Sequence, residues 1–114
     1  MSILKKAITF SYDDGVLYDN HLIEIFNKYN IKATFNICTG SKEAADKGWR
    51  TKNGTLVKRN DFSKKENICI YDGHEIAVHT RNHLWLNKID DEHLNDEILG
   101  NKRDLEEMFK REVI

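Results

Sequence analysis

Two pairs of side chains in this sequence could perform chemistry together. Asp13 and Asp14 are adjacent carboxylates, and His79 and His83 are separated by three residues. Two histidines at this spacing lie on one side of a helical turn and can share a metal ion. With Asp14 as a third ligand, coordination positions would remain open for water and substrate, which is typical of a catalytic metal site rather than a structural one.

The other carboxylate of the aspartate pair would then be free for proton transfer. A carboxylate beside a metal ion can accept a proton from the water that attacks the substrate. We therefore expect Asp13 to act as the base and Asp14 to bind the metal. Each motif also has an ordinary structural explanation, because Asp-Asp-Gly is a common turn and histidines four residues apart are common neighbours on helices.

The elements that would position the aspartates alternate between strand and helix. Ala7–Phe10 is a short β-prone run, and we predict that the aspartates follow its C-terminal end in a turn. Apolar residues at helical spacing predict a helix from about Tyr18 to Tyr29, and Ile31–Cys38 is predicted as a second strand. A strand, a helix and a strand in this order form a βαβ unit, whose strands are parallel.

The middle of the chain is predicted to leave this sheet. A short helix is predicted from Ser41 to Lys47, and Trp49–Arg59 contains an Asn-Gly pair between strand-like residues, which is a strong hairpin signal. Ser63 opens a Ser-Lys-Lys-Glu segment with the spacing of a capping box, so we expect it to cap the next short helix.

The histidines follow a third predicted strand, Glu75–Val78. Because parallel strands end on one face of a sheet, this strand should deliver His79 to the same edge as the aspartates. A long helix with Asp90 or Asp91 as its N-cap is predicted to run to the end of the chain. The sequence therefore predicts an α/β fold with about three parallel strands, flanking helices and a small hairpin excursion.

Composition excludes several classes of function. The chain has 114 residues, of which 18 are Lys or Arg and 19 are Asp or Glu, so it has room for one domain and a formal net charge of -1. This charge gives no electrostatic reason to expect a nucleic acid or an anionic membrane as a partner. No segment approaches the ~20 apolar residues of a membrane span. The two cysteines, Cys38 and Cys69, have no CxxC spacing and are interpreted as structural.

Three segments resemble the opening of one known family. They are Phe10–Gly15, Lys32–Phe35 and Gly73–His83, in this order. Together they are similar to the polysaccharide deacetylase family, also called NodB-like or carbohydrate esterase family 4. The resemblance implies a partial irregular (β/α) barrel, of which residues 1–114 would form the N-terminal portion.

The resemblance also implies an activity and a set of roles. It implies metal-dependent hydrolysis that removes acetyl groups from N-acetylated sugars or polysaccharides, at a carbon-nitrogen bond that is not a peptide bond. It assigns the base to Asp13 and a divalent metal to Asp14, His79 and His83. Zinc is the expected metal, with cobalt, nickel or manganese as alternatives, and the expected partner is a carbohydrate substrate.

Some parts of the family pattern do not follow His83 in this chain. The proline-containing segment, a later Asp segment and the Leu-x-His segment with the general acid are all absent, and the chain contains no proline. A truncated, non-catalytic homologue that binds metal or sugar is therefore the alternative function. The absence of a signal peptide predicts a cytoplasmic location, whereas a trimmed N-terminal segment would allow action outside the cell, at the cell wall.

Three further residues are weaker candidates for the site. Thr80 occupies the Ser/Thr position of the family's histidine motif, and His74 is expected to hydrogen-bond or support the site rather than to bind metal. Trp85 is expected either to pack under the metal loop or to line a sugar cleft, and core packing is the commoner fate. An open sheet of about three strands would also expose its edges, which could pair two copies into a homo-oligomer.

Overall fold

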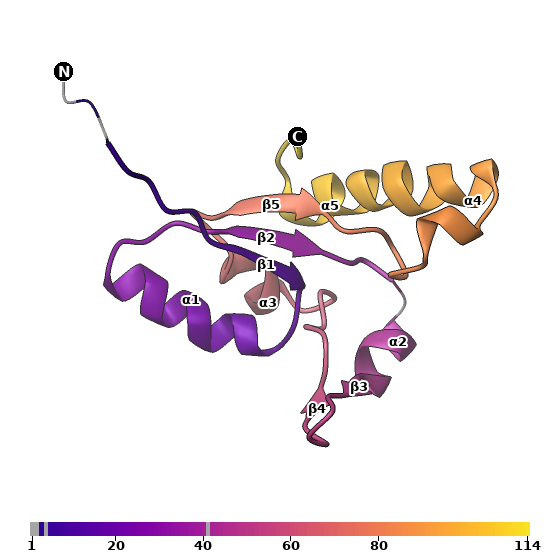
Figure 1. Ribbon diagram of the computed structural model, residues 1–114, viewed down its shortest axis with the longest axis horizontal. Coiled ribbons are helices and arrows are strands. Elements are labelled where there is room, and N and C mark those ends of the chain that lie inside the picture. The colour runs from indigo at the N-terminus through magenta and orange to yellow at the C-terminus, as the bar shows by residue number, and fades with distance from the viewer. Residues whose placement is uncertain (1–2, 4, 41) are drawn as a thin grey trace.

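The computed structural model describes residues 3, 5–40 and 42–114. Its centre is a parallel sheet of three strands, β1 (Ser11–Asp14), β2 (Thr34–Ile37) and β5 (Glu75–Val78), with β2 in the middle (Figure 1). Helix α1 (Tyr18–Lys28) connects β1 to β2, as the βαβ prediction requires. The predicted α/β class and the three parallel strands are therefore confirmed.

The segment between β2 and β5 contains the predicted excursion. Helix α2 (Lys42–Lys47) is followed by strands β3 (Trp49–Arg50) and β4 (Leu56–Val57), which pair in antiparallel fashion and hang below the sheet in Figure 1. Helix α3 (Lys65–Cys69) returns the chain to β5. The predicted first residue of α2, Ser41, lies outside the described residues.

The C-terminal part is one long helical run interrupted by a wider turn. A short 3₁₀ helix, η1 (Leu86–Lys88), is followed by α4 (Asp91–Asn95), a π-helical turn η2 (Asp96–Gly100) and α5 (Asn101–Phe109). The predicted N-cap is confirmed as Asp90, whose carboxylate accepts a hydrogen bond from the backbone N–H of His93 at 2.9 Å. None of the helices that the structure describes is long and apolar enough to span a bilayer.

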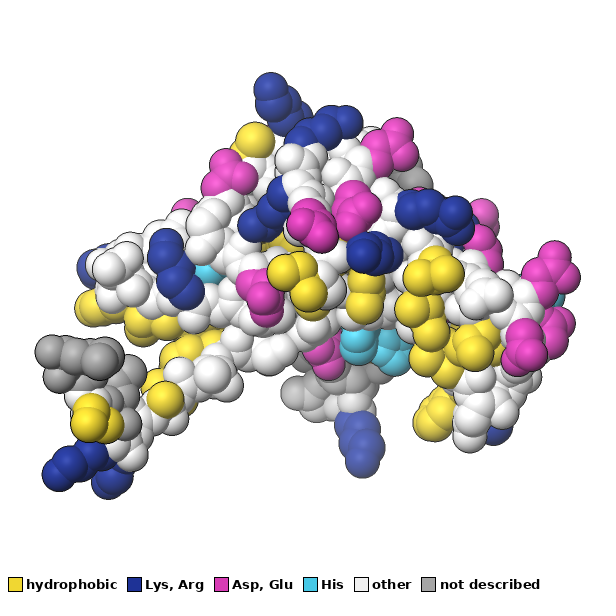
Figure 2. Space-filling model, turned by 90° about the horizontal axis from the view of Figure 1, so that it is seen from above, with side chains coloured by type: hydrophobic (Ala, Val, Ile, Leu, Met, Phe, Trp, Pro, Cys, Tyr) yellow, Lys and Arg dark blue, Asp and Glu magenta, His cyan; other side chains and the backbone are white. Residues whose placement is uncertain are grey.

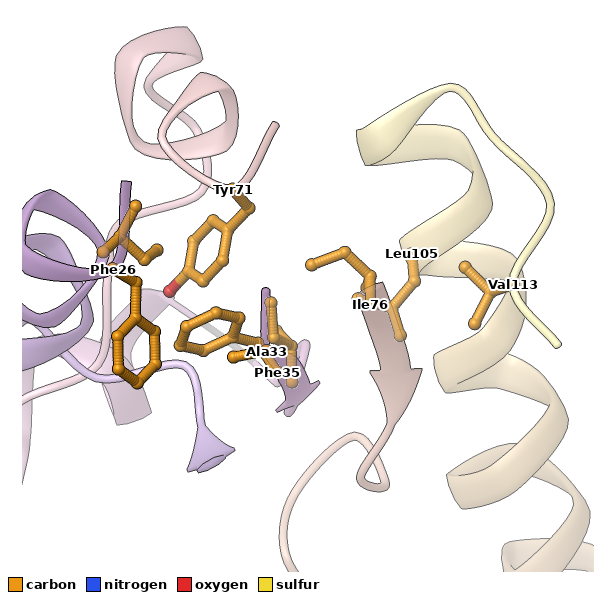
Figure 3. Packing of buried hydrophobic residues seen from close by; sticks show 9 residues of the cluster. Phe26, Ala33, Phe35, Tyr71, Ile76, Leu105 and Val113 are labelled. Atoms are coloured by element: carbon orange, nitrogen blue, oxygen red, sulfur yellow. The ribbon is translucent and has the colours of Figure 1, made fainter. Parts of the chain in front are cut away.

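The two faces of the sheet have different characters because side chains alternate along each strand. One face carries Phe35, Ile37 and Ile76, which share a buried cluster with residues of α1 and α5 and with Tyr71, which follows α3. Figure 3 shows Phe35 and Ile76 in this cluster. The other face is polar, and Thr34 Oγ1 donates a hydrogen bond to Glu75 Oε1 across it at 2.7 Å. The buried cluster comprises Ile23, Phe26, Ala33, Phe35, Ile37, Tyr71, Ile76, Leu105 and Val113.

Two details of the predicted elements are wrong. The first strand is not Ala7–Phe10 but the next four residues, because β2 begins only at Thr34 and pairs with β1 from Ser11 onward. The aspartates therefore lie within the strand and not in the turn after it. Ser63 does not cap α3, because its hydroxyl bonds to Asp61 Oδ1 instead, and the N-cap position is Lys64 with no side-chain cap bond.

Candidate metal centre

The sheet brings Asp14, His79 and His83 together at one edge. Asp14 is the last residue of β1, and His79 directly follows β5. Asp14 Oδ1 lies 3.3 Å from His79 Nε2 and 3.4 Å from His83 Nε2, and one ligand atom from each residue lies within 4.8 Å of the other two. Figure 2 shows neighbouring histidine side chains on the surface, next to an acidic side chain and a group of hydrophobic side chains.

These three side chains fit a divalent metal ion. Asp14 Oδ1 and His79 Nε2 are buried and have no hydrogen-bond partner among the described residues. Buried polar atoms without partners are costly, so their convergence calls for a ligand between them. A tetrahedral ion with bonds of about 2.0 to 2.1 Å would hold its ligands about 3.3 Å apart, which agrees with the two distances from Asp14 Oδ1 to the histidine nitrogens.

The neighbouring carboxylate of Asp13 points to the polar face of the sheet. Its side chain is 61% exposed, and its Oδ2 lies 4.0 Å from His79 Nε2. Asn36 of β2 donates a hydrogen bond from Nδ2 to Asp13 Oδ1 at 3.1 Å, which fixes the direction of the carboxylate. Adjacent positions on one strand thus give the two aspartates different surroundings, one facing the histidines and one facing solvent beside them.

The loop between the two histidines is not the helical turn that their spacing predicts. Thr80 and His83 both have left-handed backbones, with φ angles of 67° and 57°. Thr80 Oγ1 accepts a hydrogen bond from the backbone N–H of His83 at 3.0 Å. The chain turns back on itself at these residues, so the two imidazole rings meet with centroids 5.1 Å apart.

The C-terminal helical run clamps this loop from outside. Arg81 donates two hydrogen bonds of 2.8 Å to the carboxylate of Asp104 and one of 2.7 Å to Asp96. Asn82 donates from its backbone and its side chain to Glu97, at 2.8 and 2.7 Å. Burial raises the pKa of Asp104, but hydrogen bonds from Arg81 and others outweigh this and hold that pKa below its usual range.

Asn101 links the loop to the sheet. This side chain is fully buried, and its Oδ1 accepts a hydrogen bond from the backbone N–H of His79 at 2.8 Å. Its Nδ2 donates to Ile37 O and to Thr39 Oγ1, at 3.1 and 2.9 Å. Sequence reasoning missed Glu97, Asn101 and Asp104. The only signal for them is a row of polar residues at helical spacing where an apolar face would be expected.

The weaker candidates have different outcomes. Thr80 lies in the metal loop and holds His83 as described, whereas His74 is buried at the opposite end of β5. Its Nδ1 accepts from Ala33 N at 3.2 Å and its Nε2 bonds to Asn27 Oδ1 at 2.8 Å, so it has the hydrogen-bonding role without supporting the metal group. Burial and nearby cationic side chains lower the pKa of His74.

Trp85 is exposed rather than packed in the core. Its side chain is 75% accessible, and Lys88 Nζ lies 5.5 Å from the ring centroid. The expectation of core packing is therefore wrong, because the turn after His83 carries the ring outward before η1 begins. The neighbouring Leu84 and Leu86 line a cavity of about 270 Å³ together with both histidines and Thr80.

The parallel α/β sheet agrees with the NodB-like fold that the three sequence motifs imply. Residues 3–114 match the family model described as polysaccharide deacetylase. The chain belongs to the polysaccharide deacetylase family, and the resemblance of its three motifs is confirmed.

Individual relatives agree with this assignment. Over 112 residues the chain is 29% identical to a peptidoglycan-N-acetylglucosamine deacetylase of Bacillus cereus, a match that covers 96% of this chain and 45% of that protein. Among solved structures, the Streptococcus pyogenes deacetylase PplD in complex with acetate is similar, with a TM-score of 0.74 and 23% identity over 97% of this chain and 45% of PplD. A family 4 carbohydrate esterase from Bacillus anthracis has a TM-score of 0.67 at 16% identity, covering 92% of this chain and 44% of the esterase. The chain thus spans less than half the length of these relatives.

Proposed function

We propose that this chain carries part of the active site of a metal-dependent hydrolase that removes acetyl groups from N-acetylated sugars or polysaccharides. The observation that carries the proposal is the convergence of Asp14, His79 and His83 on a point where two buried polar atoms have no partner among the described residues. The carboxylate of Asp13 lies beside this point and supplies the general base that such a site also needs.

Each side chain has one role in this proposal. Asp14, His79 and His83 would hold a divalent ion, and zinc fits best because two imidazole nitrogens and one carboxylate oxygen are ligands that suit it. Cobalt, nickel and manganese are the alternatives. When bound, the ion supplies Lewis acidity toward the acetyl carbonyl oxygen.

The proton is handled by Asp13. Its carboxylate accepts a proton from the attacking water, while the hydrogen bond from Asn36 keeps one carboxylate oxygen in place. The water oxygen bonds to the acetyl carbon, the carbon-nitrogen bond breaks, and acetate and an amine leave after the nitrogen takes up a proton. No residue is assigned to that last protonation, so complete turnover is proposed for a domain of the relatives' length.

The substrate class follows from the relatives. A Bacillus cereus relative is named as a deacetylase of peptidoglycan N-acetylglucosamine, which supports an N-acetylglucosamine-containing glycan as the substrate. Glycans of this kind are cell-wall polymers, so we propose the cell wall as the place of action. A non-catalytic metal- or sugar-binding role is the second candidate, since no residue among those described is assigned to protonate the leaving nitrogen.

Calorimetric titration with Zn²⁺ tests the metal centre directly. The unaltered chain is expected to bind one equivalent of zinc, and the double variant His79→Ala, His83→Ala is expected to lose this binding. The double variant His21→Ala, His93→Ala removes two exposed histidines away from the site and should bind like the unaltered chain. Equal zinc binding by the His79, His83 variant would contradict the proposal.

An acetate-release assay separates the two candidate functions. The zinc-loaded chain would be incubated with N-acetylated chitooligosaccharides, with the His79→Ala, His83→Ala variant as the blank. Metal-dependent release of acetate supports the hydrolase, whereas zinc binding without acetate release, both by this chain and by a domain of the relatives' length that contains it, supports the binding homologue.

A further inference from the structure

The chain segment that follows the hairpin is attached to the backbone next to Asp14. Leu17 N donates to Lys58 O at 2.9 Å, and Asn60 N donates to Gly15 O at 2.8 Å. Between these bonds, Arg59 forms an antiparallel bridge with Val16. The excursion is therefore anchored directly to the residues that leave the metal edge of the sheet.

A buried side chain makes this attachment firm. Asn60 is 1% exposed, and its Nδ2 donates to Val16 O at 3.2 Å, to Asn20 Oδ1 at 3.1 Å and to Tyr71 Oη at 2.9 Å. These three contacts tie the segment to Val16, to α1 and to Tyr71, while Asn60 Oδ1 is buried without a partner among the described residues. The backbone of Arg59 is consequently held in place beside the metal edge and does not depend on the tip of the hairpin.

The side chain of Arg59 contrasts with that of Arg81. Arg81 donates one hydrogen bond from each of its three guanidinium nitrogens to Asp96 or Asp104, whereas Arg59 makes no hydrogen bond or ion pair with any described residue through its guanidinium. Its Nε atom is nevertheless buried, and its Cζ lies 6.0 Å from the ring centroid of Trp49. A guanidinium beside an indole is supported on one face and keeps its N–H donors free in the plane.

Arg59 and the metal candidates line the same cavity. A space of about 240 Å³ is bounded by Asp14, Trp49, Arg59 and His83. The carboxylate of Asp14 places its Oδ1 against the two histidines, and Arg59 Nε is buried without a hydrogen-bond partner among the described residues. The cavity thus combines a cation without a partner, an aromatic wall and two candidate metal ligands.

We propose that Arg59, supported by Trp49, is a positioning residue that binds a carboxylate in this cavity. A guanidinium prefers carboxylates, which accept two parallel N–H bonds from it, and a buried donor without a partner gains most from such a ligand. Hydrolysis of an acetyl group releases acetate at this position, so the assignment of acetate as the carboxylate rests on the proposed function. A carboxylate on an acidic sugar is the other source of the same chemistry.

Titration of the metal-free chain with acetate tests this assignment without involving the metal. Acetate binding, followed by NMR or calorimetry in the presence of a chelator, is expected to weaken about tenfold in Arg59→Gln, the loss of one charge-assisted hydrogen bond. Arg59→Lys keeps the charge and should retain part of the affinity. Arg50→Gln is the matched control, since this arginine lies on β3 and donates a hydrogen bond to Gly54 O.

The remaining measurements identify the source of the carboxylate and separate this inference from the proposed function. Acetamide, which is neutral and of similar size, should not bind, and tighter binding of glucuronate than of acetate would assign the cavity to an acidic sugar. Equal acetate affinity of Arg59→Gln and the unaltered chain, with circular dichroism showing both to be folded, would overturn the inference. Because acetate binding is measured on the metal-free chain, failure of the metal proposal would be seen in the zinc titration alone.

Discussion

Asp19 is a charged residue enclosed by the fold at the start of α1. It is 3% exposed, and Tyr71 Oη donates a hydrogen bond of 2.7 Å to its Oδ2. Burial raises the pKa of Asp19 to about 6, the hydrogen bond from Tyr71 opposes this, and the nearby charge of Asp14 adds to it. The fold therefore holds the proton of Asp19 more tightly than the unfolded chain does.

The substitution Asp19→Asn should remove the free-energy cost of ionising this buried carboxyl group. Since the folded pKa lies above the unfolded value of 3.8, the stability of the unaltered chain falls as pH rises from about 4 to about 6 and then levels off. The variant is expected to gain at most about 3 kcal/mol relative to the unaltered chain above pH 6, and little below pH 4. Urea denaturation at pH 4 and pH 7 measures this, and an equal stability difference at both pH values would contradict it.

Among single residues, those with a local signature could be predicted and those without one could not. Asp13, Asp14, His79 and His83 stand in short motifs beside strand-like runs, so their chemistry and their common edge follow from the sequence. Arg59 lies in no such motif, and its position depends on a chain segment that returns across more than 40 residues. Only tertiary structure places such a side chain next to the site.

At the scale of elements, the metal loop depends on a close approach to the end of β2. A Cβ atom on Gly40 would lie 2.6 Å from the backbone oxygen of Arg81 and 2.8 Å from Asn82 Oδ1. The loop is itself held from the other side by Glu97, Asn101 and Asp104, so it has no room to move away. The π-helical turn occurs where Glu97 and Asn101 meet the loop, and such turns are frequent at functional sites.

The substitution Gly40→Ala should therefore displace the metal loop. We expect a loss of stability of about 1 to 3 kcal/mol, typical of an overpacked site, together with weaker zinc binding. Thermal unfolding and zinc titration measure the two effects. Gly54→Ala is the control, because this residue lies at the hairpin tip with open space around it and a φ of +85°. It should lower stability without changing zinc affinity, and unchanged zinc affinity in Gly40→Ala would be evidence against the clamp.

The errors in the predicted elements have a common physical cause. Strand Glu75–Val78 and the helix that begins at Tyr18 were predictable because local alternation and periodicity determine them. The true extent of β1 depends on its register with β2, and the turn at Thr80 and His83 depends on contacts with a helix some 20 residues later. Such long-range contacts override local preferences and leave no local pattern.

At the scale of the whole molecule, the two cysteines differ in exposure and therefore in reactivity. Cys69 is exposed, whereas Cys38 is 2% exposed and donates a hydrogen bond from its thiol to His79 O. Burial raises the pKa of Cys38 to about 11, so little reactive thiolate forms at neutral pH. In the folded chain, only Cys69 should be readily alkylated.

Alkylation with iodoacetamide at pH 7.5 should modify Cys69 quickly and Cys38 only through unfolding. Mass spectrometry of the separated peptides gives both rates, and the rate for Cys38 should rise with added urea in step with loss of the fold. In the variant Cys69→Ser, alkylation of Cys38 can be measured without background from the exposed cysteine. Similar rates at both sites in the absence of urea would show that the end of β2 is more open than described.

The sheet order β1-β2-β5 follows the order of the strands along the chain. Partners in β1 and β2 are 23 residues apart, and partners in β2 and β5 are 41 apart. During synthesis β2 and β5 are each made after the strand with which they pair, and the βαβ unit can assemble before β5 is made. Asp13 and Asp14 belong to the part that forms first, whereas both histidines come with the last strand. We therefore expect affinity for zinc to appear in the nascent chain only after β5 and both histidines have been made.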